Sequence, residues 1–220
     1  MNRRSRLRTL RTLIVLASGA LAAACQTNPP YDYTNFRAHP PRSVLVLPPL
    51  NESTAVQGTY GYLSTVTQPL AERGYYVFPV EVVDKFLKEN GMPTPGEMHQ
   101  VPLEKAAEIF GADAILFLTL QEYGSKYQVF SATTTVSVAA KLVDTRTSAL
   151  LWDGVGYAQQ GSSSSGGLIA DLIGAALSQV INSKMDTGHG VSRLANQFMF
   201  NKPKAELPYG PYNPKYGQPP

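Results

Sequence analysis

Hydrophobic and polar positions divide the chain from residue 43 onward into two halves with different periods. In the first half, short aliphatic runs typical of buried strands alternate with segments of helical period. In the second half, apolar and polar residues alternate one by one, which is typical of an antiparallel meander. The predicted strands are 44–47, 75–80, 114–118, 127–143 and 149–157, and the predicted helices are 59–73, 81–89, 102–111, 168–184 and 191–200. This order predicts one α/β (α+β) domain over residues 43–202, with a mixed β-sheet and flanking helices.

The helix predicted at 168–184 has an unusually wide apolar surface and follows a Gly- and Ser-rich loop. Small residues recur on it every four positions, and such a ridge lets two backbones approach closely. One interpretation is that the helix packs on the sheet as core. The other is that part of its surface meets a second subunit, a partner or the bilayer. The candidate residues for that contact are Ala170, Gly174 and Ser178 on the ridge, with Leu172, Ile173 and Leu177 beside it.

The N-terminus shows the three zones of a secretion signal. Residues 1–11 hold five arginines and no acid, residues 12–21 are almost wholly apolar, and three alanines ending at Ala24 precede Cys25. The apolar run is shorter than the about 20 residues that a membrane-spanning helix needs. We therefore expect cleavage after Ala24 and lipid attachment at Cys25, the only cysteine. Gln26 follows, where Asp is the usual inner-membrane retention signal, and so indicates the outer membrane. We expect the anchored protein to face the periplasm.

Proline-rich segments flank the predicted domain on both sides. Residues 25–42 contain two Pro-Pro pairs, which exclude regular structure and predict an extended, lipidated tether. Fully stretched, this tether spans at most roughly 60 Å. Residues 203–220 contain six prolines and three tyrosines. Because that composition cannot bury a core, it predicts a disordered tail.

The formal charge of +3 belongs to the precursor, which has 19 basic and 16 acidic residues. Loss of residues 1–24 removes five arginines and no acid, so the mature chain has 14 basic residues against 16 acidic ones. Its net charge is then close to −2. We therefore expect no nucleic-acid partner on the basis of charge.

Catalytic and metal-binding patterns are absent from the sequence. His39, His99 and His189 are widely separated, lie in predicted loops or boundaries, and are expected to be solvated. The serine loop at 161–167 does not match G-x-S-x-G, and no phosphate-binding glycine motif occurs. We therefore predict that the chain is not an enzyme and that it holds no metal and no cofactor.

Several stretches resemble a family of uncharacterised bacterial lipoproteins first noted as a neisserial vaccine-candidate antigen. They are residues 41–49 with Asn51 and Ser53, then 69–80, 111–116 and 151–154. The resemblance covers about residues 41–200 and leaves the tail outside. It implies a fold similar to the amino-terminal domain of TolB and to curli-secretion lipoproteins, and it implies no catalytic activity. Relatives of that fold form outer-membrane rings for secretion or activate peptidoglycan synthases.

Three hypotheses on function follow. The first is a non-catalytic accessory to assembly, secretion or transport, anchored in the outer membrane, which binds envelope proteins and forms homo-oligomers through the helix at 168–184. The second is an activator of a peptidoglycan synthase, for which the tether is short. The third is a small-ligand binder or hydrolase, for which no residue nominates a site.

Overall fold

The computed structural model describes residues 30–128, 131–161 and 187–218, and those from Asp32 onward belong to one compact unit. Cys25, Ala24 and the helix predicted at 168–184, with all six of its candidate contact residues, lie outside the described residues. Within the described ranges, no helix is both long enough and apolar enough to cross a membrane.

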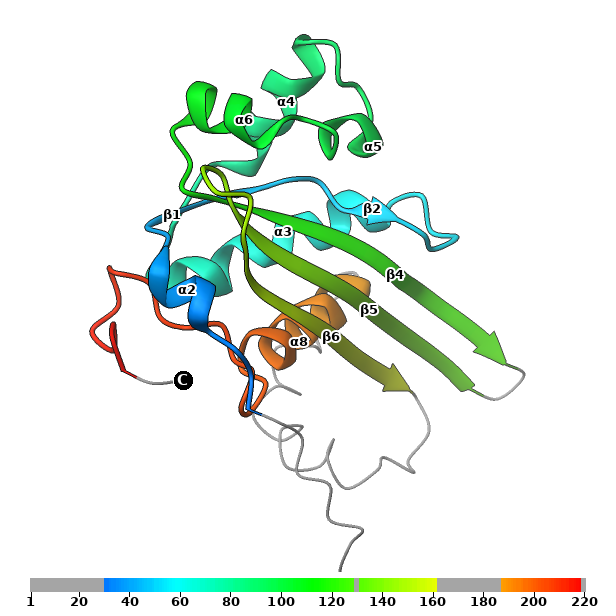
Figure 1. Cartoon of the computed structure of the whole chain (residues 1–220). Helices are drawn as coiled ribbons and strands as arrows, with labels where there is room; N and C mark the ends of the chain where they lie inside the picture. The colour runs from blue at the N-terminus through cyan, green and yellow to red at the C-terminus, as the bar shows by residue number, and fades with distance from the viewer. Residues whose placement is uncertain (1–29, 129–130, 162–186, 219–220) are drawn as a thin grey trace, which may run out of the picture. The chain divides into compact units, whose positions relative to one another are not determined.

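The unit is built on one mixed six-stranded sheet (Figure 1). Its strands are β1 (Ser43–Val46), β2 (Leu50–Asn51), β3 (Tyr76–Val77), β4 (Ala114–Gln128), β5 (Ser131–Asp144) and β6 (Leu150–Gly161). The order across the sheet is β3-β1-β4-β5-β6, with β2 paired to β4. The pairs β1–β3, β1–β4 and β2–β4 are parallel, whereas β4–β5 and β5–β6 are antiparallel. The predicted fold class, an α/β domain with a mixed sheet, is confirmed.

Helices cover both faces of the sheet around β1 (Figure 1). They are α2 (Thr34–Ala38), α3 (Gly58–Glu72), α4 (Val80–Glu89), α5 (Pro95–Met98), α6 (Leu103–Phe110) and α8 (Thr187–Phe200). Leu45 and Leu47 pack with α4, α5 and α6 in a cluster of buried apolar residues. The alternate residues Val44 and Val46 are also fully buried and point to the opposite face, where α3 and α8 lie. The continuous aliphatic run of β1 therefore reflects burial on both faces.

Strand β4 is much longer than the sequence predicts. We expected a strand at 114–118, but β4 pairs with β5 from Ala114 to Gln128. Its second half carries exposed polar residues such as Gln121 and Glu122 between the buried Leu120 and Tyr123. A register shift between Leu120 and Glu122 also interrupts the alternation of faces. The aliphatic run marks only the part of β4 that is buried on both faces.

The N-terminal flank corrects the prediction of an extended tether over 25–42. Helix α2 lies within it and buries two aromatic rings, Tyr33 and Phe36, each only 6 % exposed. The proline pairs exclude regular structure at their own positions, and the proline-free stretch between them folds onto the unit. Six residues, 26–31, therefore separate Cys25 from the unit at Asp32, and the chain between these two residues spans at most about 25 Å.

The C-terminal flank corrects the prediction of a disordered tail over 203–220, since residues up to 218 are placed. Residues 201–213, which we call the C-terminal strap, run beside the end of α3 (Figure 1). Leu207 within the strap is fully buried. The prediction was wrong because it rested on the small number of apolar side chains. Main-chain hydrogen bonds and one buried arginine hold this segment instead.

Candidate functional site

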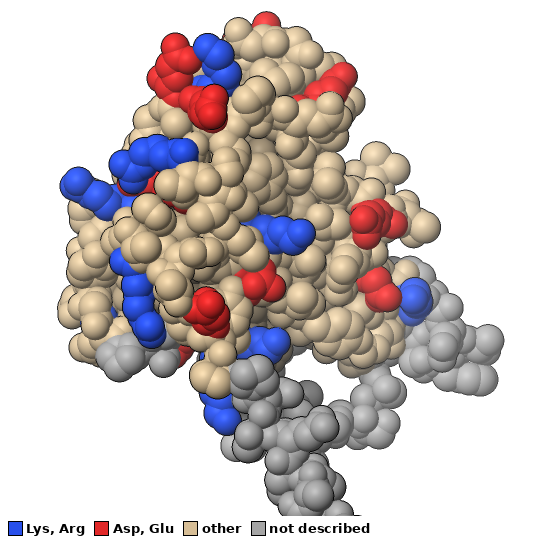
Figure 2. All heavy atoms as spheres, viewed as in Figure 1, with Lys and Arg blue, Asp and Glu red and all other residues tan. Residues whose placement is uncertain are grey.

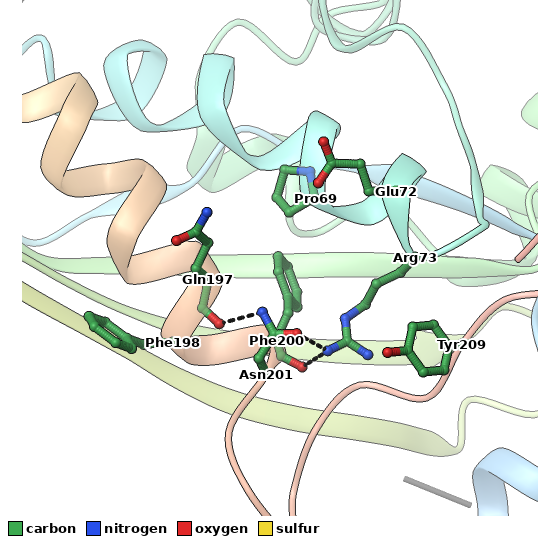
Figure 3. Close-up of a pocket in the computed structure, with 8 residues that line it drawn as sticks. All are labelled: Pro69, Glu72, Arg73, Gln197, Phe198, Phe200, Asn201 and Tyr209. Carbon is green, nitrogen blue, oxygen red and sulfur yellow. Dashed lines mark hydrogen bonds between the residues drawn. The ribbon is translucent and has the colours of Figure 1, made fainter. Parts of the chain in front are cut away.

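Arg73, the residue after α3, holds the C-terminal strap against the unit. Its side chain is buried although it belongs to a type that is seldom buried. One terminal nitrogen (Nη1) donates to the carbonyl of Leu207, and the other (Nη2) donates to the carbonyl of Phe200 and to Oδ1 of Asn201 at 2.6 Å. Figure 3 shows the side chain reaching from α3 to the end of α8. The guanidinium thus joins the end of α3 to the end of α8 and to the strap, which lie at least 127 positions later in the sequence.

The charge of Arg73 has two further partners, Glu206 and Tyr209. A carboxylate oxygen of Glu206 lies 3.7 Å from Nη2, and the ring centroid of Tyr209 lies 5.1 Å from the guanidinium carbon. Burial lowers the pKa of Arg73, while Tyr209 and Glu206 oppose that shift. An arginine stays protonated in proteins, so the cation is retained and stabilised by these groups.

The main chain at the end of α3 adds a second set of bonds to the strap. The amides of Gly210 and Tyr212 donate to the carbonyls of Arg73 and Gly74, at 2.8 and 3.0 Å. The hydroxyl of Tyr75 donates to the carbonyl of Pro208 at 2.5 Å, and burial raises the pKa of that hydroxyl. Gly74 has φ +87°, and a Cβ there would lie 2.3 Å from the Asn213 nitrogen. Only glycine permits this close approach.

Helix α2 and strand β6 also bind the strap. The hydroxyl of Tyr33 donates to the carbonyl of Glu206 at 2.7 Å, and the indole of Trp152 donates to the carbonyl of Ala205 at 3.0 Å. Burial, followed by the nearby Glu206, raises the pKa of Tyr33 to about 12. The two flanks of the domain therefore touch one another through Tyr33.

A hollow of about 410 Å³, which we call the helix-end hollow, lies where α3 and α8 end beside the strap (Figure 3). Pro69, Phe198 and Tyr209 give it apolar surface, with Gln197 and Glu72 also in its lining. Phe198 is 39 % exposed. The polar atoms of Arg73 are directed to the strap, so the hollow offers mainly apolar and aromatic contact.

A second hollow of about 320 Å³, the anchor-side hollow, lies between α2 and the strap. Its lining is rich in rings: Tyr33, Phe36, Pro208, Tyr209 and Tyr216. Tyr209 lines both this hollow and the helix-end hollow. The strap therefore contributes to two adjoining surface features.

A third hollow, of about 560 Å³, has a polar lining between the β2–α3 loop and the outer part of the β4–β5 hairpin. Glu52, Glu122 and Lys126 bring charge to it. Ser125 and Thr134, which also line it, have hydroxyl oxygens 2.7 Å apart. These two hydroxyls satisfy each other.

The predicted solvated histidines need one correction. His99 is half-buried, with Nε2 2.9 Å from the carbonyl of Pro48 and its ring edge-on to Phe117 at 5.4 Å between centroids. Burial lowers its pKa, while the bond to Pro48 opposes the shift. His39 and His189 are of intermediate exposure. Among the residues that the structure describes, no group of three or more His, Cys, Asp or Glu could hold a metal ion.

Sequence reasoning missed a buried cluster of three polar residues between α3 and α8. The hydroxyl of Tyr62 donates to Oδ1 of Asn196, and Nδ2 of Asn196 donates to Thr65 Oγ1 at 2.9 Å. An asparagine among the apolar positions of the helix predicted at 191–200 was the available signal. All three groups satisfy one another, which gives them a structural role.

The stretches that carry the family resemblance also have structural roles. Asp113 Oδ2 accepts bonds from the amides of Arg42 and Ser43 and from the Ser43 hydroxyl, at 3.0–3.1 Å. The Asp113 amide donates to the same hydroxyl at 3.0 Å. This reciprocal contact fixes the start of β1 beside β4. Trp152 is fully buried, and its ring lies 5.7 Å from that of Phe200.

Comparison with known proteins assigns the family. The model of the family described as "Putative lipoprotein GNA1162-like" matches residues 31–212. The chain belongs to this family. The match includes α2 and nearly all of the strap, whereas the resemblance seen in the sequence stopped at about residue 200. Residues 31–42 of the N-terminal flank and 203–212 of the C-terminal flank thus lie within the family match.

Two relatives from Neisseria meningitidis are similar over most of their length. The "Putative lipoprotein NMB1124/NMB1162" of serogroup B is 44 % identical over 186 residues, 83 % of this chain and 86 % of the relative. The crystal structure of lipoprotein GNA1162 matches at 47 % identity and a TM-score of 0.54, over 65 % of this chain and 100 % of that one. The match confirms the fold.

A more distant likeness is to a PelC dodecamer from Paraburkholderia phytofirmans, at 16 % identity and a TM-score of 0.42. It covers 71 % of this chain and 92 % of that one. At these values the likeness says nothing about function.

Proposed function

We propose that this lipoprotein is a non-catalytic accessory of the cell envelope that binds partner proteins through the helix-end hollow. The observation that carries the proposal is that the donors of Arg73 are used within the fold, which leaves apolar and aromatic side chains as the contact surface of the hollow. Arg73 donates to two carbonyls and to Asn201, and so stabilises the fold. Phe198 and Pro69 remain as contact surface. Exposed aromatic and apolar residues beside a satisfied polar group are typical of protein contacts.

The proposal includes anchoring through lipid on Cys25 after cleavage at Ala24, in the outer membrane that Gln26 indicates, with the protein facing the periplasm. Assembly, secretion or transport at that membrane is the process it would serve. Mass spectrometry of the mature N-terminus tests the lipid directly. In Cys25→Ala, the protein should be lost from the membrane fraction. An unchanged fractionation of Cys25→Ala would refute the anchor.

Site-specific photo-cross-linking in intact cells tests the partner surface. A photoreactive residue replaces Phe198 in one variant and Val82 in the control. Val82 is a suitable control because it is an exposed apolar residue on α4. We expect discrete adducts from position 198 and none from position 82. Equal adducts from both positions, or none from either, would refute the assignment of the hollow. An adduct with a peptidoglycan synthase would favour the activator hypothesis.

Self-association through the helix predicted at 168–184 is a separate part of the proposal and concerns residues outside the described ranges. Three of its six candidates, Ala170, Gly174 and Ser178, form the ridge that permits a close backbone approach, in which a bulky side chain is not tolerated. We therefore expect Gly174→Leu to abolish cross-linked oligomers, whereas Asp171→Asn should leave them unchanged. Oligomers that persist in Gly174→Leu would refute this part alone.

A further inference from the structure

The anchor-side hollow lies close in sequence to the residue proposed to carry lipid. Tyr33 and Phe36 follow Cys25 by eight and eleven residues, and both line this hollow. The chain from Cys25 to Tyr33 spans at most about 29 Å when fully extended. Because α2 packs both rings onto the unit, the hollow cannot move away from the anchor independently. An anchored protein therefore carries this hollow within about 30 Å of the bilayer.

The side chains around the hollow are aromatic and basic. Tyr216 is 49 % exposed, Arg37 is part of the lining, and Lys215 Nζ lies 5.5 Å from the ring centroid of Tyr209. Among the described residues that line the hollow, none has a carboxylate. The nearby Glu206 carboxylate is paired with the buried Arg73. Figure 2 shows basic side chains, with acidic ones among them, along the side of the molecule that carries α2.

This combination matches the chemistry of a membrane surface. Tyrosine favours the headgroup level of a bilayer, where its ring is apolar and its hydroxyl is wet. Lysine and arginine favour anionic headgroups, and each raises the bound-to-free ratio by about fivefold. We propose that the anchor-side hollow docks on the anionic headgroups of the membrane that holds the lipid. This inference rests on the lipid attachment in the proposed function and not on the partner surface.

Spin labelling of the purified lipidated protein tests the docking. Cys25 is the only cysteine and is consumed by lipid, so an introduced cysteine is a unique labelling site. Gln218→Cys places a nitroxide at the rim of the anchor-side hollow. Val82→Cys is the matched control, because Val82 is 64 % exposed on α4, away from the hollow. Each is measured in vesicles of phosphatidylcholine alone and of phosphatidylcholine mixed with phosphatidylglycerol, with a water-soluble relaxing agent.

We expect the label at 218 to lose accessibility to the relaxing agent only on the anionic vesicles, while the label at 82 stays accessible on both. Removal of two cations in Arg37→Gln with Lys215→Gln should lower the docked-to-undocked ratio about 25-fold. Added salt should weaken docking in the same direction. Asp32→Asn, which removes an exposed carboxylate just before α2, should strengthen docking.

Equal accessibility of the label at 218 on both kinds of vesicle would overturn the proposal. So would protection that survives in the double variant, or protection that glycerol 1-phosphate produces without anionic lipid, since a free anion would then be the ligand. Flotation of the labelled protein with vesicles is measured first. A protein that does not float has no anchor, and then both this inference and the anchoring part of the proposed function fail. Loss of docking with normal flotation overturns this inference alone.

Discussion

Replacement of Arg73 by methionine tests how the C-terminal strap is held. Methionine keeps much of the apolar stem but cannot donate, so the carbonyl of Leu207 loses its donor, while the carbonyl of Phe200 keeps the Leu207 amide as a donor. A buried acceptor without a partner costs about 1–3 kcal/mol. Loss of the cation also leaves the Glu206 carboxylate without its ion pair, while removal of a buried charge relieves a desolvation penalty. We therefore expect a net destabilisation of about 2–4 kcal/mol.

The effect should be visible globally and locally. For a unit of this size, 1 kcal/mol lowers Tm by about 2–4 °C, so Arg73→Met should melt roughly 5–15 °C below the wild type. Hydrogen exchange shows which part of the chain is destabilised. The amides of Leu207, Gly210 and Tyr212 are bonded to Phe200, Arg73 and Gly74 in the native state. They should lose protection first, while amides within β5 stay protected.

Arg193→Met is the matched control, because it makes the same change on an exposed helical residue. Arg193 donates to Gln68 Oε1 at 2.8 Å, an exposed contact whose loss should cost less than about 0.5 kcal/mol. Arg73→Lys should be intermediate, since lysine keeps the charge and loses the planar fork. If Arg73→Met melts like the wild type and the strap keeps its protection, the guanidinium does not hold the strap and the argument from buried acceptors is wrong.

Three other substitutions test separate features. Gly74→Ala places a Cβ 2.3 Å from the Asn213 nitrogen at φ +87°, so it should cost at least about 2 kcal/mol and free the strap in hydrogen exchange. Burial lowers the pKa of His99 in the folded state. Its contribution to the free energy of unfolding is therefore full above the unfolded pKa of about 6.5 and is lost as the pH falls through the folded pKa. Urea titrations of His99→Gln at several pH values should lack this pH dependence. Asp113→Ala leaves two amides and the Ser43 hydroxyl without an acceptor and should cost about 2–4 kcal/mol by urea unfolding, whereas Asp113→Asn should cost less.

The parts of the fold that sequence predicts well are those with strong local periodicity. The run at 44–47 and the helix at 59–73 match β1 and α3 to within two residues at each end. A helix buried along one stripe, or a strand buried on both faces, has apolar residues at the buried positions, and this periodicity is visible in the sequence. The outer part of β4 has no such apolar periodicity, because it is half-exposed and contains a register shift. The four-residue helix α5 is set by a capping box at Thr94, which is too short a signal for periodicity to show.

The site could not be predicted, because its contacts are distant in sequence. Arg73 bonds to residues 127, 128 and 134 positions away, and in the sequence it is an ordinary basic residue between a helix and a glycine. The strap lacks the aliphatic runs that predict burial. It is held instead by its amides, which donate to carbonyls at the end of α3. Amino-acid composition reports how apolar the side chains are and contains no information about main-chain hydrogen bonds of this kind. The resemblance identified the family correctly but missed that the flanks belong to it.

The two corrected flanks bear on the choice between the functional hypotheses. Tyr33 binds the carbonyl of Glu206, so α2 and the strap stabilise each other. With α2 folded, only six residues, 26–31, would separate the unit from a lipid on Cys25 in the proposed anchored form. That length favours partners that come to the anchoring membrane over a reach to an enzyme in another membrane. Tyr209 lines both hollows, so docking of the anchor-side hollow on the bilayer, as proposed, would restrict the surface beside a partner in the helix-end hollow. Partner binding should therefore be weaker for the unlipidated protein in solution than for the anchored form.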